Sequence, residues 1–233
     1  MGNAHASQPE TPPVPGPRAL YVAAGIWLAA FLFLTLLVDV RVFYEAGPWF
    51  PCFSRDAGFC LTALRKPGGA VELADAFLAQ FDYYGWPSAA CLALVVSLLA
   101  AGVEYLARRA LGGTREPWAY PVAALALIAF GRYGRHGAPL LGLTLAIGMA
   151  VLQVAWHPGS RRARLVQFVV LDALLYYLAG GPAVVFVLFC AASEFCVTRD
   201  EPLGAATLLA GLVIPLLVGV VGYGLPVDTA FVR

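Results

Sequence analysis

Charged residues are scarce in this chain of 233 residues. Asp, Glu, Lys and Arg make up 12% of the sequence, about half their share in soluble domains. The net charge is only +1, so no basic excess is present for binding nucleic acid, and a nucleic-acid partner is excluded.

Cysteine and histidine are also few. The chain has five Cys and three His residues without a Cys-x-x-Cys pair, so we expect no metal site and no cofactor built on them. Cys52 and Cys60 share one loop, and whether they form a disulfide depends on the redox compartment that this loop faces.

Apolar residues, by contrast, make up 61% of the chain, and its mean hydropathy is +0.77. This composition predicts an all-α polytopic transmembrane bundle that has the lipid bilayer as its solvent. Since a crossing needs about 20 helical residues, we predict about seven spans: 20–38, 86–106, 118–130, 139–156, 165–178, 183–197 and 203–224.

The domain boundaries follow from these spans. Residues 1–19 are predicted to be a disordered tail, 20–225 the helical domain, and 226–233 a short C-terminal tail. Five or six spans result instead if the short segments pair as re-entrant halves. The glycine-rich stretches 131–137 and 180–182 are either tight hairpins or breaks between half-helices.

Arginine distribution gives the orientation. With a cytoplasmic N-terminus, eight arginines lie on the inner side and three in the short outer segments. Loop 39–85 is then extracytoplasmic, and the protein is predicted to be a bacterial inner-membrane protein. The inner arginines are Arg18, Arg108, Arg109, Arg115, Arg161, Arg162, Arg164 and Arg199.

Loop 39–85 contains two predicted amphipathic helices. The first covers 54–66, with Asp56 in its first turn, and Pro67-Gly68-Gly69 ends it. The second covers 70–81, with an apolar stripe formed by Ala70, Leu73, Ala74, Phe77, Leu78 and Phe81. Its other face, with Glu72, Asp75 and Gln80, is expected to face water. Because both helices are short, they must pack on the bilayer or on the spanning helices.

The same region carries a family resemblance. Lys66-Pro67-Gly68-Gly69, Phe77-Leu78-Ala79-Gln80-Phe81 and Tyr83-Tyr84 resemble a PGG…FLxQFxYY signature in the N-terminal membrane part of an uncharacterised bacterial multipass family, a domain of unknown function. The segment from Tyr176 to Pro182 resembles a second feature of that family. The resemblance covers about 20–224 and implies a membrane fold without an established activity.

The loop is also similar in layout to membrane glycosyltransferases that use lipid-linked sugar donors. That similarity implies a catalytic carboxylate among Asp39, Glu45 and Asp56, with Arg41 or Arg55 holding a donor phosphate. The tight acidic pair typical of those enzymes is absent here.

Two acids lie inside apolar helices, where charge is costly. Asp172 and Glu194 either form a proton or cation relay, or are paired, Asp172 with Arg132 or Arg135 and Glu194 at the interface near Arg199.

Two further patterns suggest contacts. Arg161, Arg162 and Arg164 either bind acidic lipid headgroups or only fix topology. Small residues recur every fourth position at Ala138, Gly142, Ala146 and Ala150, a face for close contact within the chain or with a protein partner or second protomer.

The leading functional hypothesis is a membrane scaffold or partner-binding domain of uncharacterised activity. The alternatives are a glycosyltransferase acting at the extracytoplasmic face and a small proton-coupled transporter.

Overall fold

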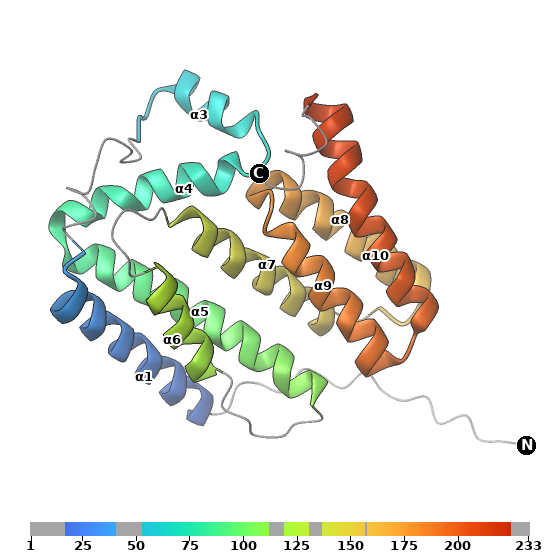
Figure 1. Ribbon diagram of the computed structural model, residues 1–233, viewed down its shortest axis with the longest axis horizontal. Coiled ribbons are helices and arrows are strands. Elements are labelled where there is room, and N and C mark those ends of the chain that lie inside the picture. Colours follow the sequence, from blue (N-terminus) through green and yellow to red (C-terminus); the bar gives the residue numbers. More distant parts are fainter. Residues whose placement is uncertain (1–16, 41–52, 112–118, 131–136, 157, 225–233) are drawn as a thin grey trace, which may run out of the picture.

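Seven apolar segments form helices that pack side by side (Figure 1). The computed structural model describes residues 17–40, 53–111, 119–130, 137–156 and 158–224, and this part of the chain contains helices and turns but no strand. The seven helices are α1 (Pro17–Phe33), α5 (Trp86–Ala110), α6 (Ala119–Phe130), α7 (Ala138–Ala155), α8 (Arg161–Ala179), α9 (Ala183–Ser193) and α10 (Glu201–Pro215). Three continue into π-helical turns: η1 (Leu34–Val38), η3 (Glu194–Thr198) and η4 (Leu216–Gly222).

These helices match the predicted segments to within a few residues. The helix α1 begins at Pro17, so the predicted tail of 1–19 extends three residues too far. Four helices in the described part of the chain are long and apolar enough to cross a membrane: Tyr21–Val38, Trp86–Ala110, Ala138–Ala155 and Glu201–Gly222. The segments Ala119–Phe130 and Ala183–Thr198 are apolar but shorter.

Successive helices of the bundle run in opposite directions (Figure 1). At one end, the Ala119 amide donates to Glu104 Oε2 at 3.1 Å and joins the start of α6 to the end of α5. At the same end, Gln153 Nε2 of α7 donates to the Arg164 carbonyl of α8 at 3.2 Å. We call this the basic end, because it carries Arg108, Arg109, Arg161, Arg162, Arg164 and Arg199.

The opposite end, here called the loop end, is covered by the segment between α1 and α5. In this segment α3 (Ala57–Leu64) is followed by α4 (Gly69–Ala79) and by the 3-10 turn η2 (Gln80–Tyr84). The helix α4 packs against α7 and α8, whereas α3 packs on α4 and buries none of its residues (Figure 1). The two predicted short helices are therefore present, and of the two supports that the sequence left open, the structure shows α4 on the bundle helices and α3 on α4.

The predicted faces of α4 are wrong in part: Glu72 and Gln80 are exposed as expected, but other residues are not placed as predicted. Phe77 is 44% exposed, and Asp75, expected to face water, is 8% exposed. The reason is a tertiary contact: a Cβ added to Gly137 would lie 2.5 Å from Asp75 Oδ1. The carboxylate thus lies at the N-terminus of α7, where the helix dipole favours negative charge.

The small-residue face of α7 packs inside the chain. Gly142, Ala146 and Ala150 are buried, and a Cβ added to Gly142 would lie 2.8 Å from Pro182 Cγ. The sequence left open whether this face contacts the same chain or another protein, and the structure shows contact within the chain at these three residues. Ala138, the fourth small residue, is half-buried.

Candidate functional site

The most unusual side chain in the bundle is Asp172, in the middle of α8. It is 0% exposed, and neither carboxylate oxygen has a hydrogen-bond partner among the described residues. Burying a carboxylate costs free energy unless it is paired. Because such a group is costly to keep, Asp172 is the first candidate for a functional residue.

The helix α9 contributes an aromatic ring and a thiol to the part of α8 around Asp172. One turn earlier on α8, Phe168 stacks on Phe186 of α9, with ring centroids 5.3 Å apart. The buried Cys190 thiol is within electrostatic reach of both Asp172 and Glu194. Three titratable groups therefore lead from the middle of the bundle toward its basic end.

Glu194 belongs to an ion-pair network at the basic end. Arg164 Nη1 donates to Glu194 Oε2 at 2.8 Å, and its Nη2 donates to Asp200 Oδ2 at 3.3 Å. Arg161 Nε also donates to Asp200 Oδ2, at 2.7 Å, and the Thr198 hydroxyl donates to Glu194 Oε2 at 2.6 Å. The network ties the start of α8 to η3 and to the start of α10.

One alternative placed Glu194 at the interface near Arg199, but its carboxylate pairs with Arg164 instead. The turn η3 points Glu194 into the bundle, toward α8, whereas Arg199 is exposed and ends the turn with a φ of 52°. Arg164, whose side chain is largely buried, pairs with both Glu194 and Asp200. The predicted alternative partners of Asp172, Arg132 and Arg135, lie outside the described residues.

The predicted headgroup-binding arginines thus have different environments. Arg161 and Arg164 are ion-paired within the chain, and only Arg162 of the three is exposed without an ion pair in the described part of the structure. Headgroup binding by this cluster stays a prediction.

Buried amide groups extend the polar path along α8. Neither side-chain polar atom of Gln167 has a hydrogen-bond partner in the described part of the chain, nor has Gln153 Oε1. Most buried polar groups in proteins are paired, so these amides and Asp172 mark the α7–α8 region as the place where a polar ligand, water or proton would be stabilised.

The catalytic candidates of loop 39–85 that lie among the described residues occupy the ends of helices. The Asp56 carboxylate accepts from the Phe59 amide at 3.1 Å and caps α3, next to the exposed Arg55. Asp39 is exposed at the C-cap of η1 with a φ of 47°. Arg41 and Glu45 lie outside the described residues, so catalysis by this set stays a prediction.

Sequence analysis missed a polar contact at the loop end. The Ser88 hydroxyl in the first turn of α5 donates to Asp82 Oδ1. Burial raises the pKa of Asp82 from 3.8 to about 6; the Ser88 hydrogen bond lowers it, and the negative charge of Asp75 raises it. Asp75 and Asp82 lie seven positions apart and belong to no recognised motif. The fold places Asp75 at the start of α7 and Asp82 at the start of α5.

The two family-signature segments contact each other. The Gly68 amide donates to the Tyr177 carbonyl at 3.0 Å, and the Tyr177 hydroxyl donates to the Leu64 carbonyl at 3.1 Å. Gly68 has a φ of +78°, and a Cβ there would lie 3.3 Å from the Ala179 carbonyl oxygen. We call this contact between 64–69 and 177–180 the latch, because it fixes α4 to the bundle.

Within the described ranges, no group of three or more His, Cys, Asp or Glu side chains could hold a metal ion. Cys60 is a free thiol, whose Sγ lies 3.7 Å from the Ser54 carbonyl oxygen, and Cys52 lies outside those ranges.

The fold defines the class of protein: an all-α bundle of apolar helices with several of membrane-spanning length. Comparison with protein families identifies the particular group. The chain belongs to a family of unknown function, DUF6057, which matches residues 17–232. No curated protein and no solved structure gives a significant match.

Proposed function

We propose that this protein crosses the bacterial inner membrane seven times, with its N-terminus in the cytoplasm, and acts as a scaffold that presents α3 and α4 to a protein partner. The observation that carries the proposal is the latch, whose hydrogen bonds attach the partly exposed helices α3 and α4, here called the platform, to an apolar bundle.

Seven crossings are supported by the alternating helix directions and by the apolar outer surface. Large aliphatic side chains on the outside are highly exposed, among them Leu36 (75%), Leu125 (65%), Leu209 (65%) and Val221 (77%). Monomeric soluble proteins rarely expose large continuous apolar surfaces. The 12-residue helix α6 is about 18 Å long, but it lies against α5 and α1, which cover part of it.

The orientation is supported by the location of the arginines. Six of them are at the end where α5 stops and α8 starts, and arginine-rich segments favour the cytoplasmic side. The platform of α3 and α4 is at the opposite end, so this orientation makes it extracytoplasmic.

Partner binding is supported by the exposed platform. The helix α3 has no buried residue, and Leu61 is 55% exposed. Phe53 packs edge-on against Phe59 and Phe77, with ring centroids 6.4 Å and 5.4 Å away. Exposed aromatic and aliphatic groups on a fixed support are typical of protein-interaction surfaces.

Photo-crosslinking in cells tests the scaffold proposal. A photoreactive amino acid at Leu61 should give one discrete protein adduct, whereas the same group at Leu209, on the outside of α10, should react with lipid only. If Leu61 gives no protein adduct, or the same products as Leu209, the platform does not bind a partner.

Proton-coupled transport is a second candidate function, favoured by the unpaired, buried carboxylate of Asp172. The groups facing it include Cys190 of α9, with Glu194 about one turn further along the chain at the start of η3. In proteoliposomes with an imposed pH gradient, the wild type should dissipate the gradient, and Asp172→Asn should lose this activity while Glu72→Gln, on the surface of α4, retains it. Equal rates in all three proteins would exclude this role.

A further inference from the structure

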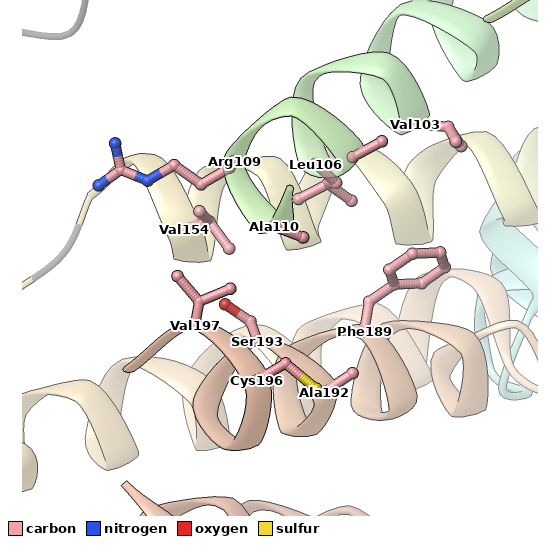
Figure 2. Close-up of a pocket in the computed structure, with 11 residues that line it drawn as sticks. Val103, Leu106, Arg109, Ala110, Val154, Phe189, Ala192, Ser193, Cys196 and Val197 are labelled. Carbon is pink, nitrogen blue, oxygen red and sulfur yellow. The ribbon is translucent and has the colours of Figure 1, made fainter. Parts of the chain in front are cut away.

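A cavity opens in the side of the bundle at its basic end, between α5, α7 and α9 with η3 (Figure 2). Its volume is about 210 Å³, and its wall is almost entirely carbon. Val103 and Leu106 line it from α5, Val154 from α7, and Phe189, Ala192 and Val197 from the α9–η3 segment.

The wall determines what can occupy the cavity. Water needs two to four polar partners to be stable in a cavity, and this wall offers few, whereas an apolar cavity of about 150 Å³ holds a molecule the size of benzene. A helix with side chains is about 10 Å wide and is too large for this volume. The cavity therefore suits part of a hydrocarbon chain.

The positively charged side chain of Arg109 lies at one end of the cavity. Arg109 lines it with its stem, and Figure 2 shows its guanidinium directed away from the apolar wall. Its neighbour Arg108 is paired with Glu104 at 2.7 Å, and Arg161 and Arg164 are also paired, but Arg109 has no acidic partner within 4.0 Å in the described part of the chain. Its charge is therefore open to an anionic ligand.

We propose that this cavity binds one anionic phospholipid, whose acyl chain lies against Val154 and Phe189 and whose phosphate is bound by Arg109. A guanidinium binds phosphate oxygens through two parallel hydrogen bonds, and basic pockets between spanning helices on the cytoplasmic side are typical of such sites. The inference rests on the proposed insertion in the membrane, but not on the scaffold or transport roles.

Native mass spectrometry of the full chain, delipidated in mild detergent, tests this site. Titration with phosphatidylglycerol and with phosphatidylcholine should show one tightly bound phosphatidylglycerol. Arg109→Gln should weaken that binding at least tenfold and remove the preference over phosphatidylcholine. The matched control is Arg162→Gln, which removes an exposed arginine from the same end and should bind as the wild type does.

Two more measurements test the cavity itself. Ala192→Phe should fill it and reduce the binding of both lipids, with Ala110→Leu on the opposite wall as a second variant should the first fail to fold. Glycerol phosphate, which has the anionic group without a chain, should not compete. Three results would each overturn the proposal: equal phosphatidylglycerol binding by Arg109→Gln and Arg162→Gln, unchanged lipid binding after the cavity is filled, or competition by glycerol phosphate. Extraction of the protein from membranes without detergent would instead overturn the proposed insertion.

Discussion

Gly68 gives the sharpest test of how the segment between α1 and α5 is attached to the bundle. Its φ of +78° lies in the left-handed region, and the Ala179 carbonyl oxygen would be 3.3 Å from an added Cβ. The left-handed conformation costs a residue other than glycine about 1–2 kcal/mol. The contact with a backbone oxygen adds to this cost, because the oxygen cannot move without its helix. We therefore expect Gly68→Ala to destabilise the closed latch by about 2 kcal/mol.

The measurement is hydrogen–deuterium exchange of residues 66–72 in the purified protein. Since about 1.4 kcal/mol corresponds to a factor of ten, amides protected by the latch should exchange about 30-fold faster in Gly68→Ala. Gly148→Ala is the matched control, because a Cβ there meets nothing within 4 Å and alanine favours a helix. If both variants exchange at the same rate, the latch does not hold α4.

Three further predictions concern stability. Glu194→Gln should lower the free energy of unfolding by about 1–3 kcal/mol, since the largely buried Arg164 guanidinium loses one of its two carboxylate partners and keeps Asp200, whereas Glu72→Gln at an exposed pair should cost less than about 1 kcal/mol. Thermal unfolding in detergent checks both, and equal effects would contradict the network. Because the folded pKa of Asp82 is raised from 3.8 to about 6, its contribution to stability is greatest below pH 4 and decreases as the pH rises through 6. Asp82→Asn should remove this part of a melting-temperature profile, and an unchanged profile would show that Asp82 does not titrate there. Gly211→Ala would place a Cβ 2.3 Å from a methyl group of α9 and should lower the free energy of unfolding by about 1–3 kcal/mol. A melting temperature equal to that of the wild type would contradict this contact.

The helices could be predicted because their signals are local. Long apolar runs, and breakers such as Gly180 and Pro67, set the boundaries of the apolar helices and of α3 and α4 within a few residues. The rotation of α4 could not be predicted, because Asp75 is buried by contact with Gly137 at the start of α7, which lies 62 residues further along the chain.

The candidate site was predicted in part. The burial cost of charge in apolar helices singled out Asp172 and Glu194, and both are buried. The partner of Glu194 could not be predicted, because Arg199 is the nearest cation in the sequence, whereas the π-helical turn directs the carboxylate to Arg164 on another helix. The latch and the cavity join segments far apart in the chain, so no local pattern reveals them.

The most direct test of the central claim, that the bundle lies in the bilayer between a cytoplasmic basic end and an extracytoplasmic platform, is thiol labelling in intact spheroplasts. In a cysteine-free background, Thr62→Cys on exposed α3 should react with a membrane-impermeant maleimide, and Ser160→Cys at the start of α8 should react only after permeabilisation. Labelling of both positions from outside, or of Ser160→Cys alone, would contradict this arrangement.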